Sequence, residues 1–240
     1  NSMSFGIAKD IRSEVRVCTP ELFHRAIESQ VVAEVCAQIK DALEAVRRGE
    51  MSPEDFETLK GNLKKALIIF TFHATFKNGR RKNNEAVSSG LSIYDIDHIP
   101  NPRAKWEEIE PRKEELGIVM AHITPSTEGL RLVFIIPMAP GTNRLMSLAE
   151  AQAWMASMLG DTQYDACVKD YARCSFGVMR EYVLFLSEGL FDFRHGLHGL
   201  HGTHPLPNET SGRLDDTEIC EKSVSSNQPK ATETPNNENP

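Results

Sequence analysis

The chain has 240 residues, of which 40% are hydrophobic and 25% are charged, an ordinary globular composition. The longest apolar run, residues 66–72, is too short to cross a bilayer, and the first residues lack the regions of a signal peptide, so we expect a cytoplasmic protein without a membrane partner. The net charge is −7, but residues 203–240 supply −4 of it and leave the body nearly neutral. The charge therefore does not exclude a nucleic-acid partner.

Two helices are predicted near the start of the chain. Thr19-Pro20 is a good helix start, and apolar residues such as Val31 recur at roughly helical spacing until Gly49 stops the run. We therefore expect one continuous helix between these points. A second helix is expected to begin at Ser52-Pro53 and to end near Lys65.

Strands alternate with helices in the following part of the chain. Runs of β-branched and aromatic residues predict strands at residues 66–72, 91–97, 117–123, 130–136, 173–178 and 182–186. Capping residues predict helices at residues 102–116 and 147–159. Helices followed by strands that alternate with helices indicate an α+β domain with a mixed or antiparallel sheet.

The chain is expected to form one domain followed by a tail. We assign residues 1–202 to the domain, with a helical part at 1–65 and a sheet core at 66–190. Residues 203–240 are rich in Ser, Thr, Asn, Pro and Glu, so we expect a disordered tail. The preceding histidines at three-residue spacing, from His195 to His204, are interleaved with glycines, and we interpret them as a linker rather than a metal site.

An Asp-x-Asp pair ends one of the predicted strands. Residues two apart in a strand share a face, so Asp95 and Asp97 are expected to project side by side. Two adjacent carboxylates repel each other unless a divalent cation lies between them, and oxygen ligands suit Mg²⁺ or Mn²⁺. Alternatively, the strand simply runs out into an acidic turn. His98 follows the pair directly, whereas His73 and His122 are expected to be core histidines.

Three further segments carry residues suited to phosphate or nucleic acid. The small-residue turn at 124–129 exposes backbone N–H groups and hydroxyls, and Arg131 follows it. The segment 164–176 adds Asp165 and Arg173. The bases that precede the Asp pair are candidates for nucleic-acid contacts or a solvated loop; they are Lys77, Arg80, Arg81 and Lys82.

Taken in order, these motifs resemble the archaeo-eukaryotic primase superfamily, whose members carry a strand-borne Asp-x-Asp, then Ser-x-His, then a further Asp. The chain is most similar to the bacterial branch called the VirE N-terminal or primase-like N-terminal domain, which is found beside helicases in mobile elements. The similarity covers residues 59–186. It implies a primase-polymerase-like sheet with flanking helices.

The resemblance also implies roles for individual residues. Asp95, Asp97 and Asp165 would be the catalytic carboxylates that bind Mg²⁺ or Mn²⁺. The nucleotide-phosphate contacts would be Ser126, Gly129, Arg131 and Arg173. The implied reaction is two-metal nucleotidyl transfer on a nucleic-acid template, with DNA expected, using nucleoside triphosphates and a partner helicase or ATPase chain.

Two functional classes stay open on the sequence. The Asp set favours a nucleotidyltransferase. However, Arg131 stands where polymerising members usually carry His, and Glu128 places a negative charge in the phosphate turn. These departures favour a non-catalytic module that binds nucleic acid or a partner helicase. The chain contains no GxxxxGK[ST] motif, so a helicase activity has to come from elsewhere.

Overall fold

The computed structural model describes residues 4–164 and 169–191. Contacts divide the chain into residues 1–200 and residues 201–240, and all described residues belong to the first unit. Within them the α-helices are α1 (Pro20–Ile27), α2 (Gln30–Arg47), α3 (Pro53–Lys64), α4 (Pro102–Ile109) and α5 (Leu148–Leu159). Short 3-10 turns are η1 (Asn83–Glu85), η2 (Glu110–Arg112), η3 (Arg180–Tyr182) and η4 (Glu188–Leu190). No described helix is long and apolar enough to span a membrane.

The described strands form three antiparallel sheets. The first has the order β2-β1-β3-β9, with bounds Arg16–Val17, Gly6–Ala8, Ile69–Thr71 and Ser175–Phe176. The second has the order β10-β7-β8-β6, with bounds Val183–Leu186, Ile118–Ile123, Leu130–Ile135 and Leu91–Ile96. The third pairs β4 (Ala74–Phe76) with β5 (Ala86–Ser88). This arrangement confirms the predicted α+β class.

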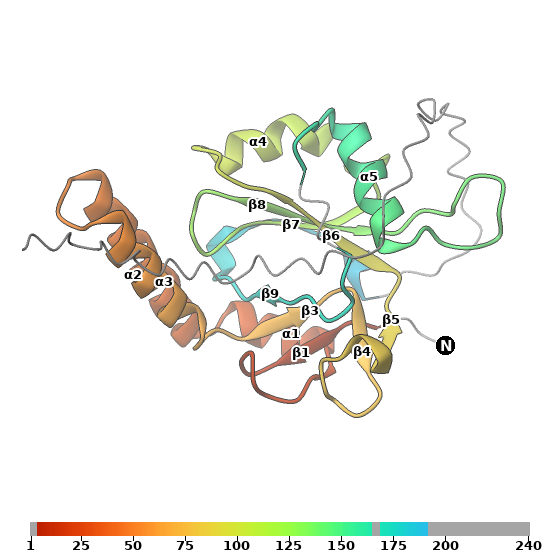
Figure 1. The fold of residues 1–240 in the computed structure, drawn as a ribbon, viewed down its shortest axis with the longest axis horizontal. Helices are drawn as coiled ribbons and strands as arrows, with labels where there is room; N and C mark the ends of the chain where they lie inside the picture. Colours follow the sequence, from red (N-terminus) through yellow and green to blue (C-terminus); the bar gives the residue numbers. More distant parts are fainter. Residues whose placement is uncertain (1–3, 165–168, 192–240) are drawn as a thin grey trace, which may run out of the picture. The chain divides into compact units, whose positions relative to one another are not determined.

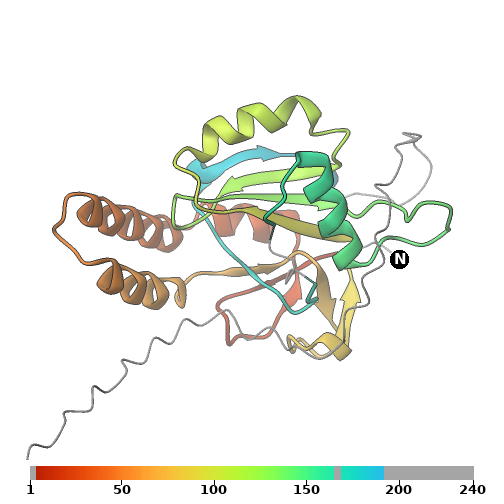
Figure 2. The same cartoon turned by 45° about the horizontal axis from the view of Figure 1, so that its top comes forward.

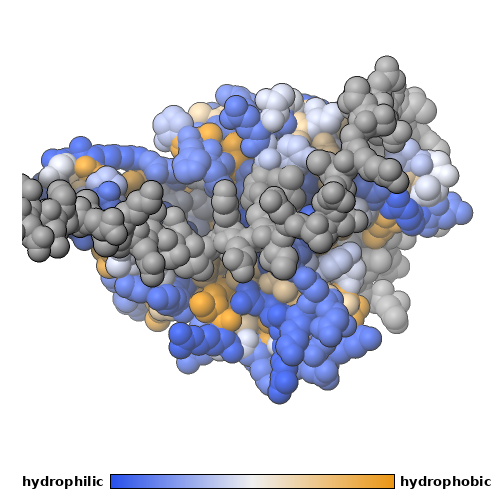
Figure 3. All heavy atoms as spheres, viewed as in Figure 1, coloured by the Kyte–Doolittle hydropathy of each residue, from blue (hydrophilic) through white to orange (hydrophobic). Residues whose placement is uncertain are grey.

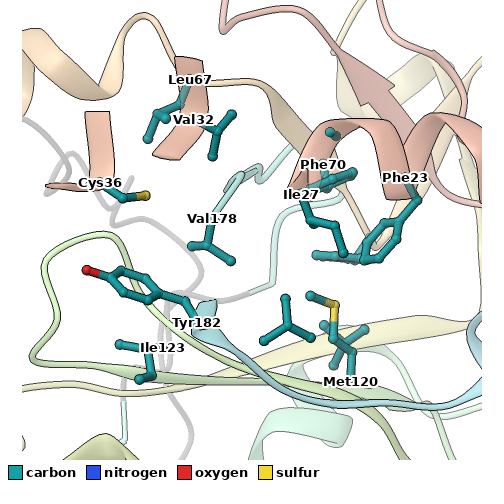
Figure 4. Close-up of a cluster of buried hydrophobic side chains, with 14 of the residues drawn as sticks. Phe23, Ile27, Val32, Cys36, Leu67, Phe70, Met120, Ile123, Val178 and Tyr182 are labelled. Carbon is teal, nitrogen blue, oxygen red and sulfur yellow. The ribbon is translucent and has the colours of Figure 1, made fainter. Parts of the chain in front are cut away.

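The second sheet is covered on both faces (Figures 1 and 2). On one face, α4 and α5 pack against Tyr94, Leu132 and Phe134, and Trp106 of α4 stacks on Phe185 at 5.6 Å between ring centroids. The opposite face contacts the first sheet and the N-terminal helices. Figure 4 shows the hydrophobic cluster on this opposite face, whose labelled side chains come from α1, α2, the segment before β3, β3 itself, β7 and the segment before β10. The sheet is therefore a buried layer.

The helix predicted after Thr19 is wrong in one respect, because the structure breaks it into two. Thr19 caps α1 through a hydrogen bond from the Leu22 N–H, but Ser29 has extended backbone and starts α2. Val31 lies in the first turn of α2 beside its buried face and is 58% exposed, whereas the prediction placed it on the buried face. The paired helices α2 and α3 lie side by side (Figure 2).

The remaining elements match the predictions with shorter bounds. The apolar run at 66–72 is buried as expected at Leu67, Phe70 and Phe72, although only three of its residues belong to β3. The helix expected at 102–116 ends at Ile109 and continues as the turn η2. Strands β1, β2, β4 and β5 were not predicted, since two or three residues are too few to show a period.

Candidate functional site

A row of polar side chains crosses the second sheet. In the register of the antiparallel strands, Asp95 on β6 lies opposite Arg131 on β8, and Arg131 lies opposite His122 on β7. Residues that face each other directly across antiparallel strands share a face of the sheet. The three side chains therefore stand next to one another on one face.

Both carboxylate oxygens of Asp95 are bound by guanidinium groups. Arg131 donates from Nε to Oδ1 at 2.5 Å and from Nη2 to Oδ2 at 2.8 Å. Arg173, which precedes β9, donates from Nη2 to Oδ2 at 3.3 Å. The side chains of Asp95 and Arg131 are 6% and 13% exposed, whereas that of Arg173 is 31% exposed. The cluster is thus a largely buried carboxylate held between two arginines, and a bidentate contact of this kind is strong and directional.

The charges of this cluster stabilise one another. Burial by itself would raise the pKa of Asp95, but the charge and hydrogen bonds of Arg131, with the charge of Arg173, hold that pKa below its usual value. Burial opposes the charge of Arg131 as well, yet Asp95 raises the pKa of the guanidinium. Both groups are therefore ionised at neutral pH.

Asp97 has the opposite electrostatic character. Partial burial of its carboxyl group and the nearby negative charge of Asp95 raise its pKa, although Arg131 acts in the other direction. Its Oδ1 atom lies 3.0 Å from the point where a side chain at Gly129 would begin. Lys64 lies close to both Asp97 and Arg131. Its pKa is lowered by burial and by the charges of Lys60 and Arg131, while Asp97 acts in the opposite direction. The carboxylates of the Asp-x-Asp pair thus interact, but they differ in their partners.

The turn between β7 and β8 lies beside this pair. Thr124 donates its backbone N–H to the Gly129 carbonyl at 2.8 Å, and Thr127 N–H donates to the Thr124 carbonyl at 2.9 Å. The hydroxyls of Thr124 and Ser126 are 3.1 Å apart. Glu128 is turned toward α2 and forms an exposed ion pair with Arg47 at 3.2 Å. The acid that stood against phosphate binding is therefore partly neutralised.

Two buried side chains fix the position of β6, which is an edge strand. The Ile93 N–H donates to Nε2 of His73 at 3.3 Å, and the Ile93 carbonyl accepts from Nε2 of Gln152 at 2.5 Å. Since Nε2 of His73 accepts, its Nδ1 carries the proton and donates to the Asp170 carbonyl at 2.9 Å. His73 thereby joins β6 to the segment that carries Arg173. These contacts hold the strand of Asp95 and the segment of Arg173 in one place.

The two core histidines are neutral. His73 and His122 are 1% and 2% exposed, which confirms their predicted burial. Burial lowers the pKa of each to about 4, with smaller contributions from the neighbouring arginines. Sequence analysis did not predict that His73 connects two parts of the site. No local pattern reports such a connection, because its partners lie 20 and 97 residues away.

The remaining candidates lie elsewhere. The bases Lys77, Arg80, Arg81 and Lys82 lie in the connection between β4 and β5, outside the sheet that carries Asp95. His98, next to Asp97, has a left-handed backbone with φ of 57°. Asp165, the histidine string and the predicted tail lie outside the described residues.

The residues described around Asp95 fit an anion better than a pair of metal ions. Both oxygens of Asp95 accept hydrogen bonds from guanidiniums, and the third predicted carboxylate, Asp165, lies outside the described residues. Arg131, Arg173 and Lys64 outnumber the two carboxylates by one positive charge. Both arginines and the hydroxyl-bearing turn are groups that bind phosphate. The described structure thus places groups of the kinds that bind phosphate next to the Asp-x-Asp pair.

Comparison with known proteins finds a family that resembles the middle of the chain. Residues 62–178 are similar to the family described as BT4734-like, N-terminal domain. The matched range includes both aspartates, the β7–β8 turn, Arg131 and Arg173, whereas β1, β2, α1 and α2 precede it. No curated protein and no solved structure matches the chain.

Proposed function

We propose that the chain is a primase-like module of a replication or mobile-element protein, and that it binds the phosphates of a nucleoside triphosphate at Arg131 and Arg173. One observation carries the proposal: two guanidiniums from distant parts of the chain converge on the buried carboxylate of Asp95. Such a cluster presents fixed cations, and arginine matches phosphate oxygens well.

The arginines have different tasks in this proposal. Arg131 is the better buried and keeps its position through two bonds to Asp95, so it serves as the fixed cation. Arg173 makes one longer bond and is more exposed, so it can turn toward a ligand. The Ser126 hydroxyl, and those backbone N–H groups of the turn that do not close it on itself as Thr124 and Thr127 do, would bind further phosphate oxygens.

A second candidate function is Mg²⁺- or Mn²⁺-dependent nucleotidyl transfer on a nucleic-acid template, most naturally DNA. The observation that favours it is the neighbouring pair of carboxylates: burial and the charge of Asp95 raise the pKa of Asp97, and a divalent cation would relieve the repulsion between the two. Such a metal neutralises charge on the transferred phosphoryl group. Because a triphosphate competes with Asp95 for Arg173, its arrival would free one oxygen of the Asp95 carboxylate from that arginine, beside Asp97. A partner helicase or ATPase chain belongs to either proposal through the family resemblance alone.

Triphosphate binding tests the first proposal. We expect wild-type protein to bind a fluorescent deoxynucleoside triphosphate, and Arg173→Gln to weaken binding about 10- to 100-fold, since a hydrogen bond to a charged group contributes about 1.5–3 kcal/mol. Arg25→Gln removes an exposed arginine of α1 instead and is the matched control. Equal affinities for wild type and Arg173→Gln, or no binding by wild type, would contradict the proposal.

Primer extension separates the two candidates. The assay uses Mn²⁺, a primed DNA template and labelled nucleotides. If the chain is a nucleotidyltransferase, we expect synthesis by the wild type, and we expect Asp97→Asn to abolish this synthesis while triphosphate binding persists. If the chain is a binding module, we expect the wild type to bind the triphosphate without any synthesis. Synthesis that survives Asp97→Asn would exclude this carboxylate from the reaction.

A further inference from the structure

An open pocket of about 310 Å³, lined mainly by charged residues, lies on the side of the domain away from α4 and α5 (Figure 1). It opens between the loop that joins β1 to β2 and the turn that follows β4. Four cations line it, Arg12, Arg80, Arg81 and Lys82, against the single acid Glu14. The region around β4 is covered by hydrophilic side chains in the view of Figure 3. The pocket therefore carries a concentrated positive charge in a chain whose net charge is negative.

The two walls of the pocket are bonded to each other. Arg81 donates from Nη2 to the Ile11 carbonyl at 3.2 Å, and the Val15 N–H donates to the Gly79 carbonyl at 2.8 Å. Gly79 has φ of 67°, and a side chain there would begin 3.2 Å from the Val15 carbonyl oxygen. Asp10 accepts the backbone N–H of Arg12 at 2.8 Å and so orders the other loop. These contacts hold the two loops in fixed positions on either side of the pocket.

A chain segment links this pocket to the Asp95 cluster. Asn83, in the turn next to the pocket, accepts the Ala172 N–H at 3.0 Å. One residue further on, Arg173 reaches Asp95. Two residues before Ala172, the Asp170 carbonyl accepts from buried His73. A ligand that occupies the pocket would therefore lie at one end of a fixed segment whose other end is the proposed nucleotide site.

We propose that this pocket binds the phosphate backbone of a single nucleic-acid strand, separately from the nucleoside triphosphate. The proposal rests on the proposed function and names the strand subsite of that function. A volume at the lower end of ligand pockets suits one sugar-phosphate unit and is too small for a duplex groove. Cations that contact backbone phosphates give binding that is independent of sequence and sensitive to salt. Arg12 is a member of this subsite that lies 68 residues before Arg80 in the chain.

Fluorescence anisotropy with a labelled 12-nucleotide single-stranded DNA tests the proposal, using the full chain between 50 and 200 mM KCl. The pocket variant combines Arg12→Gln, Arg80→Gln and Lys82→Gln and keeps Arg81, which ties the two walls together. The control variant combines Arg25→Gln, Lys40→Gln and Arg48→Gln, so that it removes the same charge from α1, α2 and the C-cap of α2.

We expect the pocket variant to bind at least tenfold more weakly, and the slope of log affinity against log salt to fall by about 2, since each lost phosphate contact removes about 0.7. The control should stay within about twofold of wild type. Equal losses in both variants would reduce the effect to overall charge and overturn the proposal. Tighter binding of duplex DNA, or equal binding of poly-glutamate, would also overturn it, as would wild-type protein that binds no strand.

Triphosphate binding by the same variants keeps this inference distinct from the proposed function. The pocket variant should bind the triphosphate as wild type does, and Arg173→Gln should bind the strand as wild type does. Loss of strand binding alone would leave the triphosphate proposal intact, and loss of triphosphate binding alone would leave the pocket proposal intact. Thermal melting of each variant shows that it is folded.

Discussion

Replacing Asp95 with Asn separates two descriptions of the Asp-x-Asp pair. If Asp95 served only as a metal ligand repelled by Asp97, removing its charge would stabilise the metal-free domain. In the structure, however, the charge of Asp95 balances two guanidiniums, one of which is 13% exposed. Asn keeps the size and one acceptor oxygen but leaves Arg131 without a counter-charge. We therefore expect Asp95→Asn to destabilise the domain.

The size of this destabilisation follows from the burial of the ion pair. Removing one partner of a buried ion pair costs about 3–5 kcal/mol, because an uncompensated charge stays buried. Arg173 is 31% exposed and can turn to solvent, so its share of the cost is small. We take the lower end, about 3 kcal/mol, which corresponds to a loss of about 6–12 °C in melting temperature for a domain of this size. The loss is independent of added metal.

Thermal and urea unfolding of the metal-free protein at pH 7 measures this effect. Asp97→Asn is the matched control, since the structure raises the pKa of Asp97 and its charge is disfavoured in the folded state. That substitution should be neutral or slightly stabilising. A double substitution with Arg131→Gln should cost less than the sum of the single changes, because neither charge then remains unpaired.

Two results would refute this reasoning. An unchanged or raised melting temperature for Asp95→Asn would show that its bonds to the arginines contribute nothing to stability. Equal losses for Asp95→Asn and Asp97→Asn would show that the two carboxylates have the same environment. The first result would mean that Asp95 does not engage the arginines in the free protein, and the second that the two carboxylates do not differ as described.

Two further predictions concern stability. His73 and His122 have pKa values of about 4 in the folded protein, against an ordinary value of 6.5, because the folded state resists their protonation. The free energy of unfolding should therefore fall as the pH decreases from 6.5 to 4, by up to about 1.4 kcal/mol per pH unit for each histidine. His122→Asn should reduce this slope, which urea unfolding at several pH values measures. In Gly129→Ala the new carbon would lie 2.7 Å from Oγ1 of Thr124, so we expect the free energy of unfolding to fall by about 1–3 kcal/mol. Gly61→Ala in α3 meets no neighbour within 4 Å and should raise the free energy of unfolding by about 0.5–1 kcal/mol. A stabilised Gly129→Ala variant would contradict the close approach.

Local signals in the sequence were sufficient for much of the fold. Thr19, Ser52 and Ser147 start helices as predicted, since each side chain accepts a backbone N–H within its own first turn. The hairpin of β7 and β8 follows from two apolar runs around a short turn. The break between α1 and α2 was missed because the apolar spacing in the sequence continues across Ser29.

The candidate site was predictable only as a set of residue types. The period of a strand placed Asp95 and Asp97 together, and a charged residue after the turn marked Arg131. Which atoms meet depends on the register between β6 and β8 and on a segment 78 residues from Asp95, and no local pattern encodes either. Tertiary packing alone decided that Asp95 is neutralised by arginines, that His73 joins two segments, and that Arg12 lies beside Arg80. The physical reason is that each of these contacts joins residues brought together by burial of the sheets, whereas capping and periodicity act within a few residues of chain.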